Sequence, residues 1–289
     1  RSTLFPYTTL FRSERCTQTA GITYGYDLSD WLTSKTTQGM AGAGTNTYGY
    51  DFAGRLTSWT KDGTTTAYGW DAANNRTRAG DKPATFDERN RLISDGTSTY
   101  SYTPRGTLAT KTTGASTETL SFDAFDRLIS QGPVSYTYDA LDRVVNRNAQ
   151  QFAYTGATNE LATDGTTKFG RGPLNELLAL NSSTDNRITL ADQHGDIIGG
   201  FDPASTSTAL ADSISYDPFG TPTATTGTRR PIGYQGDYTD PDTGQVNMTA
   251  RWYNPTTGAF TSRDTVDPTN RYTYTPGSPL NYTIGRAHV

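Results

Sequence analysis

Histidine and cysteine, which most often ligate metals or act in nucleophile and base pairs, are scarce in this chain. Its 289 residues contain two histidines and one cysteine, Cys16, so neither a cysteine-rich metal site nor an internal disulfide is indicated. His288 lies in a terminal segment that is set aside below, which leaves His194, beside Gly195 and Asp196. No Gly-x-Ser-x-Gly motif accompanies His194, so a Ser-His-Asp triad is not indicated either. We expect no metal and no cofactor, and we interpret His194 as a solvated turn residue.

Aspartates that directly follow aromatic residues are the other side chains with chemical potential. Aromatic rings stack on sugars and carboxylates accept hydrogen bonds from sugar hydroxyls, so a carbohydrate-binding or adhesion surface is one interpretation. The same pattern recurs many times along the chain, whereas a binding site usually differs from its surroundings. A structural role for these residues is therefore the preferred interpretation, and carbohydrate binding is kept as an alternative.

The recurring unit has two aromatic residues two positions apart, an Asp directly after the second, and in several copies an Arg four residues after the Asp. With Thr103 counted as a degenerate copy, equivalent positions are 16, 20 or 24 residues apart. Such steps accommodate two short strands and two turns, whereas helix-pair repeats need more than about 30 residues. The unit is therefore predicted to be a β-hairpin. Its residues are Tyr24, Tyr26 and Asp27; Tyr48, Tyr50, Asp51 and Arg55; Tyr68, Trp70 and Asp71; Asp87 and Arg91; Tyr100 and Tyr102; Asp123 and Arg127; and Tyr136, Tyr138, Asp139 and Arg143.

Elementary stereochemistry explains why these residue types suit a hairpin. Residues two apart in a strand share a face, so both rings are expected on one side of the sheet. The Asp carboxylate is expected to accept hydrogen bonds from the following backbone and shape the turn, where Gly or Asn tolerates positive φ. The Arg is expected to pair with the Asp, which contributes about 0–1 kcal/mol when exposed, and to pack over an aromatic ring.

Composition and charge agree with an all-β chain and exclude some partners. The chain is 33% hydrophobic and 11% aromatic, with a formal net charge of −4, and threonine is abundant. Aromatic and β-branched residues favour strands. The pI near 5.2 and the lack of a basic run argue against nucleic acid as a main partner. No apolar stretch approaches the roughly 20 residues of a membrane-spanning helix.

Both termini resemble translated sequencing adapters and not natural protein. Residues 3–13 resemble the one-frame translation of a widely used short-read adapter, and residues 284–289 resemble its opposite-end counterpart. A translated adapter carries no information about the natural fold. We therefore predict that residues 1–13 and 284–289 are adapter-like artefacts.

A second group of motifs lies in the C-terminal half and, together with the repeat, carries a family resemblance. The repeat, which is clearest as Tyr-Gly-Tyr-Asp-Phe-Ala-Gly-Arg-Leu at residues 48–56, resembles the YD repeat of the RHS and teneurin families from at least Tyr24 to Val145. The later motifs, in their order and spacing, resemble the RHS-repeat-associated core. Their residues are Tyr216, Asp217, Pro218, Phe219 and Gly220; Gly236; Gly244; Arg251, Trp252 and Tyr253; Arg263 and Asp264; and Asn281, Tyr282 and Thr283.

The resemblance implies a fold, a partner and a candidate catalytic pair. Proteins of this family wind YD hairpins into a hollow shell that encloses a variable C-terminal domain, commonly a secreted toxin. In many members, core aspartates cut the chain just past an Asp-Pro-x-Gly-Leu motif. By this resemblance Asp264 is a candidate proteolytic aspartate and Arg263 a neighbour that tunes its pKa. The scissile motif does not follow Thr283, so no self-cleavage is expected in this chain.

We therefore expect an all-β fold of tandem YD β-hairpins that form part of a curved or spiralling sheet, truncated at both ends. Residues 14–186 are predicted to be the repeat array and residues 187–283 the core-like region. The resemblance implies a scaffold or shell segment of an RHS-type polymorphic toxin or cell-surface protein, secreted or at the cell surface, that houses its own missing C-terminal effector. Surface glycans or secretion machinery are further candidate partners. An adhesion surface and an autoproteolytic module are the alternatives.

Overall fold

The computed structural model describes residues 8–10, 20–207, 209–266 and 269–283, which fall into two compact units. Of the described residues, unit 1 comprises 8–10, 20–67, 169–207, 209–236 and 278–283, and unit 2 comprises 68–168, 237–266 and 269–277. Each unit thus combines strands of the predicted array with a segment of the predicted core-like region. The boundary between array and core-like region at residues 186 and 187 stays a prediction.

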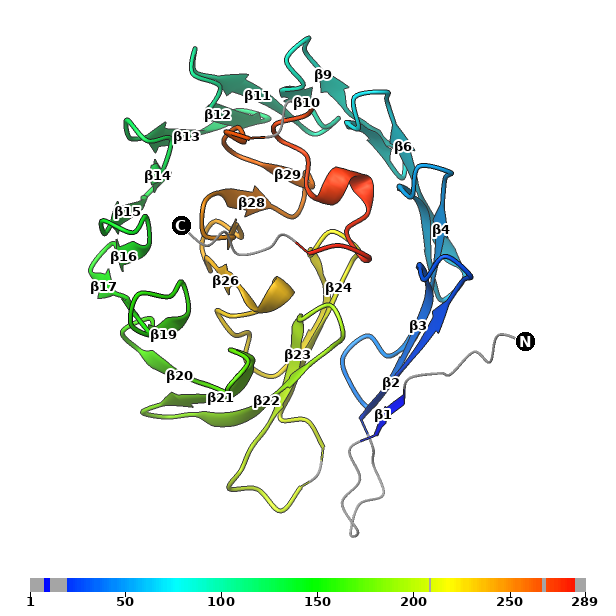
Figure 1. Ribbon diagram of the computed structural model, residues 1–289, viewed down its shortest axis with the longest axis vertical. Helices are drawn as coiled ribbons and strands as arrows, with labels where there is room; N and C mark the ends of the chain where they lie inside the picture. The colour runs from blue at the N-terminus through cyan, green and yellow to red at the C-terminus, as the bar shows by residue number, and fades with distance from the viewer. Residues whose placement is uncertain (1–7, 11–19, 208, 267–268, 284–289) are drawn as a thin grey trace. The chain divides into compact units, whose positions relative to one another are not determined.

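Unit 1 consists of antiparallel strands that follow one another in chain order (Figure 1). One series runs from β1 to β6 and the other from β20 to β25. The chain leaves unit 1 within β6 and returns to it within β20. The elements are β1 (Thr8–Leu10), β2 (Gly21–Tyr26), β3 (Leu32–Gln38), β4 (Gly44–Tyr50), β5 (Leu56–Lys61), β6 (Thr64–Trp70), β20 (Thr167–Arg171), β21 (Leu177–Ser182), β22 (Asn186–Ala191), β23 (Ile197–Phe201), β24 (Asp212–Tyr216), β25 (Pro222–Thr226) and the 3-10 turn η1 (Tyr234–Gly236).

Unit 2 repeats this organisation with shorter strands. Strands β9 to β17 pair in chain order, and β26 to β29 form a separate four-stranded antiparallel sheet. The elements are β7 (Arg76–Ala79), β8 (Lys82–Pro83), β9 (Thr85–Phe86), β10 (Leu92–Ser94), β11 (Ser98–Tyr102), β12 (Leu108–Thr113), β13 (Ser116–Phe122), β14 (Leu128–Gln131), β15 (Val134–Tyr138), β16 (Val144–Arg147), β17 (Gln150–Gln151), β18 (Ala153–Tyr154), β19 (Leu161–Thr163), β26 (Tyr238–Thr239), β27 (Val246–Asn247), β28 (Trp252–Asn254), β29 (Ala259–Phe260) and the 3-10 turn η2 (Thr275–Gly277).

Little of the adapter-like termini is described. Thr8–Leu10 form β1, which pairs antiparallel with β2. Cys16, His288 and the other residues of these two segments lie outside the described residues. Their assignment as artefacts stays a prediction.

The repeat turn has the predicted carboxylate geometry. Asp139 Oδ1 accepts hydrogen bonds from the backbone N–H groups of Leu141 (2.9 Å) and Arg143 (3.0 Å), and Arg143 Nε donates to Asp139 Oδ2 (2.8 Å). The turns that begin at Asp51, Asp87 and Asp123 repeat this pattern. Because the carboxylate satisfies two backbone donors and one guanidinium, the turn is held by contacts within five residues.

The position three residues after the Asp requires a left-handed backbone. Its φ lies between 60° and 92° in seven copies of the turn. Only Gly, Asn and Asp occupy this position, as expected for residues that tolerate positive φ. The residues are Asp30, Gly54, Asn74, Asn90, Gly106, Asp126 and Asp142.

The turn also aligns the aliphatic residue of the repeat with the second aromatic residue. Tyr50 pairs with Leu56 and Tyr138 with Val144, each next to a register shift in the ladder. Leu56 is fully buried and Val144 is 1% exposed. The Arg of one repeat lies over the second ring of the next, since the Arg127 guanidinium is 5.0 Å from the centroid of Tyr138. The predicted pairing of Arg with Asp and its packing on aromatic rings are both confirmed.

Each unit has its own core. In unit 1, Ile22, Tyr24 and Leu32 of the first hairpin pack in one cluster with Leu190 and Ile198 of the β22 and β23 hairpin. In unit 2 the core combines aliphatic residues such as Leu128 and Val134 with aromatic rings. Its ring pairs join the strands of the array to the segment 237–277 and are Tyr136 with Trp252 (centroids 4.6 Å apart), Phe152 with Tyr238 (4.9 Å) and Tyr102 with Tyr272 (5.8 Å).

The left-handed turn position yields a first test. Asp30 has φ of 61° and an exposed side chain. Asp30→Ala is expected to lower the free energy of unfolding by about 1–2 kcal/mol, because a Cβ-bearing residue without a hydrogen-bonding side chain is disfavoured in this region. Asp30→Gly is expected to retain more stability than Asp30→Ala. Urea denaturation of the two variants measures the difference, and an Ala variant as stable as the Gly variant would contradict the turn conformation.

Candidate functional site

A variant of the repeat turn in unit 1 holds a buried cluster of charged side chains. It connects β22 to β23 and has the same backbone geometry, since Asp192 Oδ1 accepts from His194 N and Asp196 N (both 3.0 Å) and Gly195 has φ of 85°. The position four residues after Asp192, which carries Arg in the turns that begin at Asp51, Asp87, Asp123 and Asp139, carries Asp196. This turn therefore buries two carboxylates and lacks its own guanidinium.

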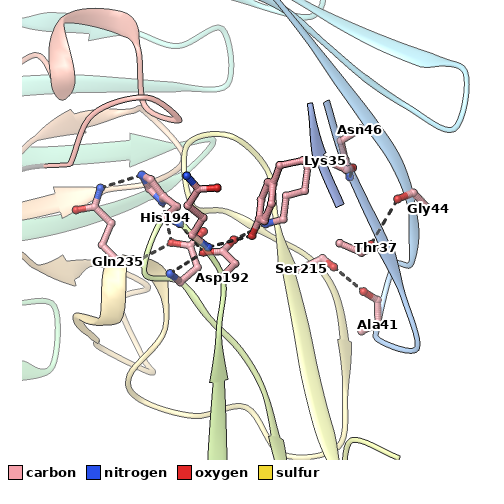
Figure 2. A network of polar contacts seen from close by, with 12 residues as sticks. Lys35, Thr37, Ala41, Gly44, Asn46, Asp192, His194, Ser215 and Gln235 are labelled. Atoms are coloured by element: carbon pink, nitrogen blue, oxygen red, sulfur yellow. Dashed lines mark hydrogen bonds and ion pairs between the residues drawn. The ribbon is translucent and has the colours of Figure 1, made fainter. Parts of the chain in front are cut away.

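Lysine from a different hairpin supplies the missing cation. Lys35 on β3 pairs with Asp192 through Nζ and Oδ2, as Figure 2 shows. The side chain of Asp192 is 1% exposed and that of Lys35 is 18% exposed. Burial alone would lower the pKa of Lys35, but Asp192 and then Asp196 raise it above its ordinary value. The pair is therefore ionised on the lysine side, and it ties β3 to the β22 and β23 turn.

His194 and Gln235 complete the cluster around Asp196. His194 Nδ1 lies 3.0 Å from Asp196 Oδ1, the backbone N–H of Gln235 donates to the same oxygen (2.8 Å), and Gln235 Nε2 lies 3.2 Å from His194 Nε2 (Figure 2). The side chain of His194 is only 9% exposed, and its ring lies 5.3 Å from that of Tyr234. The prediction of a solvated turn residue was wrong, because the ring is the hydrogen-bonding partner of a buried carboxylate.

Burial and pairing move the pKa values of the two carboxyl groups in opposite directions. Burial, only partly offset by Lys35, raises the pKa of Asp192. Burial also acts on Asp196, but His194 and its hydrogen bond outweigh it and lower the pKa of that group. When two nearby carboxyl groups have different pKa values, the group with the higher pKa can act as an acid and the group with the lower pKa as a base. Both groups already have partners within the protein, which gives them a structural role in holding the turn.

A pocket of about 220 Å³ lies beside the cluster. Its lining includes Tyr24, Asp30, Lys35, His194 and Asn281. Burial, followed by the nearby Asp192, raises the pKa of Tyr24 to about 12, so this hydroxyl stays protonated and donates or accepts as a neutral group. It accepts a hydrogen bond from the backbone N–H of Gln193 (3.0 Å). The pocket is therefore polar and holds acidic, basic and hydroxyl groups.

The charge of His194 can be tested by pH. Burial lowers its pKa, but Asp196 outweighs burial, so the folded pKa lies above the ordinary value of 6.5. The stability from the charged ring is therefore fully present below pH 6.5 and is lost as pH rises through the folded pKa. His194→Gln keeps a neutral donor and is expected to cost about 1 kcal/mol at acidic pH, and less at alkaline pH. Denaturation at a series of pH values measures this, and a difference that grows with pH would contradict the pairing.

The motif around Asp217 is structurally another repeat turn. Asp217 Oδ1 accepts from the backbone N–H groups of Phe219 and Thr221 (both 2.9 Å). Gly220 has φ of 92°, and a Cβ there would lie 2.7 Å from the ring of Tyr234. Phe219 is 1% exposed. Tyr216 precedes this turn and Pro218 lies within it, and the turn places the Phe219 side chain in the core of unit 1. Gly236 is the last residue of η1, in the same unit.

In unit 2, the segment after β26 places a carboxylate in a fully buried position. Asp240 is 0% exposed and accepts hydrogen bonds from Arg147 Nε (2.6 Å) and Nη2 (3.1 Å) and from the hydroxyl of Tyr136 (2.7 Å). Burial raises its pKa, but the hydrogen bonds from Arg147 and Tyr136 outweigh burial, and the net pKa is lowered. Sequence reasoning missed this pair. Its signal was that Arg147, unlike the repeat arginines, has no Asp four residues before it.

The remaining motif residues of unit 2 lie on its small sheet and its turns. Trp252 (4% exposed) and Tyr253 (fully buried) lie on β28, and Gly244 ends the turn before β27 with φ of 71°. The Nε1–H of Trp252 donates to the hydroxyl of Tyr138 (3.0 Å). These residues attach the segment 237–277 to the array.

Asp264, the candidate proteolytic residue, forms an ion pair with Arg251. Arg251 Nη2 lies 2.7 Å from Asp264 Oδ2, and the backbone N–H of Val266 donates to Asp264 Oδ1 (2.8 Å). The Arg251 guanidinium also lies 3.7 Å from the ring centroid of Phe260. Arg263 is exposed and lines a pocket that is described below. A proteolytic role for Asp264 and Arg263 stays a prediction.

This geometry defines a class of protein: an antiparallel β-protein built from tandem hairpins whose turns are capped by Asp. The family model described as Teneurin YD-shell matches residues 15–286. The chain therefore belongs to the teneurin YD-shell family. This confirms the predicted all-β repeat fold and its resemblance to RHS and teneurin repeats.

Solved structures resemble the chain at low sequence identity. A chain in the Tc holotoxin pore of Photorhabdus luminescens aligns with a TM-score of 0.59 at 16% identity, over 93% of this chain and 17% of that chain. A chain of the crystal structure of TcdB2-TccC3-TEV aligns with a TM-score of 0.40 at 15% identity, over 92% of this chain and 21% of that chain. The likeness to the holotoxin pore concerns the fold, and this chain spans a small part of the length of either.

Among curated proteins no match was found. Within the described residues, no helix is long and apolar enough to cross a membrane. The same residues contain no group of three or more His, Cys, Asp or Glu side chains arranged to hold a metal ion.

Proposed function

We propose that this chain is a wall segment of a protein shell that encloses a polypeptide effector, in a secreted or cell-surface toxin-like protein. The observation that carries the proposal is the match of the YD-shell family along residues 15–286, nearly the whole chain. The partner is then the effector domain that follows the shell in the same polypeptide.

The burial pattern of the array supports this proposal. Strands β11 and β15 alternate buried and exposed residues, with Tyr100 and Tyr136 among the buried ones. A sheet that packs one face and leaves the other open suits a wall, whereas a globular enzyme core usually buries both faces of its central sheet. Turns that are capped within five residues let such a wall continue hairpin after hairpin.

Protease protection tests the proposal. The longer polypeptide that contains this chain is treated with a nonspecific protease, and survival of the region that follows the shell is measured by mass spectrometry. Enclosure predicts that this region survives in the intact protein and is digested when it is expressed alone. Equal digestion rates in the two forms would reject enclosure.

Matched variants separate enclosure from intrinsic resistance. Asp240→Asn removes the buried partner of Arg147 and should open the wall, whereas Asp242→Asn changes a carboxylate whose side chain is 63% exposed. Protection of the effector should fall in the first variant and persist in the second. If both variants protect it as well as the natural protein does at temperatures where Asp240→Asn is unfolded, the wall is not what shields it.

A further inference from the structure

Unit 2 contains a pocket of about 340 Å³ that is lined by five arginines. They come from three segments: the turn after β9, the turn after β11, and the stretch that follows Ser262. The arginines are Arg89, Arg91, Arg105, Arg263 and Arg271. Such a concentration is unexpected in a chain with a net charge of −4 and a pI near 5.2.

Two of the five guanidinium groups are neutralised by repeat carboxylates. Arg91 pairs with Asp87 (Nη2 to Oδ2, 2.5 Å) and Arg105 with Asp126 (Nη2 to Oδ1, 2.9 Å). The guanidinium groups of Arg89, Arg263 and Arg271 form no hydrogen bond or ion pair with any residue that the structure describes. Among the described lining residues the one carboxylate is that of Glu88. The pocket therefore carries an excess of positive charge.

The backbone around the pocket is fixed by hydrogen bonds. The carbonyl of Arg271 accepts from Asp264 N (2.7 Å) and from Arg251 Nη1 (3.1 Å). The buried Tyr272 forms part of the lining, and its hydroxyl donates to the carbonyl of Gly106 (2.7 Å). These bonds tie Arg271 to Asp264 and Tyr272 to the turn after β11. Arg263, Arg271 and the arginine of that turn therefore lie around one space.

We propose that this pocket binds a small molecule that carries two or more oxyanion groups, such as a diphosphate. The planar guanidinium fork matches the oxygens of phosphate and sulfate, and several forks around one space favour a multivalent anion. The volume is that of a small-molecule site and is too small for a folded partner. Among the described lining residues the aromatic one, Tyr272, is buried, so it offers no exposed ring on which a base could stack, as nucleic-acid binding would require.

Calorimetric titration of the full chain with inorganic pyrophosphate at low ionic strength tests the proposal. One site per chain is expected, with an affinity that falls as salt is added. Arg263→Gln and Arg271→Gln should each weaken binding by about tenfold or more, because each removes hydrogen bonds from a charged donor. Arg78→Gln is the matched control, since Arg78 is also exposed in unit 2 but lies outside the pocket. Parallel titrations with inorganic phosphate and sulfate distinguish phosphate from sulfate as the preferred group.

The site is rejected if the natural chain does not bind pyrophosphate at millimolar concentration, or if Arg78→Gln weakens binding as much as the pocket variants do. A second measurement uses the natural chain and therefore does not require that any variant folds. Pyrophosphate should protect Arg263 and Arg271 of the natural chain from modification by phenylglyoxal while Arg78 stays reactive, as judged by peptide mass spectrometry. Equal modification of all three arginines with and without pyrophosphate would also overturn the proposal. Enclosure of an effector does not depend on this result.

Discussion

Asp240→Asn is expected to lower the free energy of unfolding by about 3–5 kcal/mol, since it leaves the Arg147 guanidinium without its buried counter-charge. Arg147 is 8% exposed and Asp240 fully buried, so water cannot replace the lost partner. Tyr136 loses a charged acceptor at the same time. Guanidinium chloride denaturation, with the slope checked for two-state behaviour, measures the loss.

Two comparisons sharpen this prediction. Asp242→Asn, which changes an exposed partner of the same arginine, should cost at most about 1 kcal/mol. The double variant Arg147→Met/Asp240→Leu should be more stable than Asp240→Asn, because it removes both charges together. A double variant no more stable than the single one would show that shape, and not unpaired charge, sets the cost.

The effect of Asp240 also has a predicted pH dependence. Its folded pKa is lowered below the ordinary 3.8, so the stability it contributes is present above pH 3.8. That stability is lost as pH falls through the folded pKa. The gap between the natural chain and Asp240→Asn should therefore narrow in acid, and a gap that widens there would contradict the ion pair.

Lys35→Met is expected to have a comparable effect in unit 1, about 3–5 kcal/mol near neutral pH, since Asp192 would remain buried without its cation. The remaining carboxyl group can escape this cost by binding a proton, and burial already raises its pKa. The destabilisation should therefore be smaller at acidic pH and grow as pH rises. Thermal unfolding of the natural chain and the variant over a pH series measures this trend.

A matched lysine and a compensating change serve as controls. Lys61 on β5 donates to the carbonyl of Gly42 and not to a carboxylate, so Lys61→Met should cost about 1 kcal/mol with little dependence on pH. In Lys35→Met/Asp192→Asn the buried charge is gone, and part of the stability should return. If the double variant is as unstable as Lys35→Met at high pH, packing of the lysine stem explains the loss instead.

The hairpin repeat could be predicted because its determinants are local. Asp139, Leu141 and Arg143 interact within five residues, and the left-handed residue Asp142 lies inside the same turn. Thr103, the degenerate copy, forms the same turn as the repeat aspartates, since Thr103 N donates to the carbonyl of Thr107 (2.9 Å). Local hydrogen bonds and strand alternation depend on residue types at short spacing, which a sequence displays directly.

His194 shows where this local reasoning fails. Its neighbours Gly195 and Asp196 correctly indicated a turn, but turns are usually exposed and this one is buried. The burial comes from Tyr234 and Gln235, about 40 residues further along the chain. A clue was present in Asp196, which occupies the position where four other turns carry Arg, because a buried turn with two carboxylates needs a cation from elsewhere.

The sequence by itself determined the repeat, its Asp-capped turns and the family, all of which follow from contacts within a hairpin. Only the tertiary structure decided which charges of different hairpins meet. Lys35 and Asp192 are 157 residues apart, and Arg147 and Asp240 are 93 residues apart. The arginine pocket likewise joins residues 88–91 and 104–106 to Arg263, Thr269, Arg271 and Tyr272. Such partners depend on how hairpins pack within each unit, and the free energy of burial that sets this packing is distributed over many side chains, so no local motif records it.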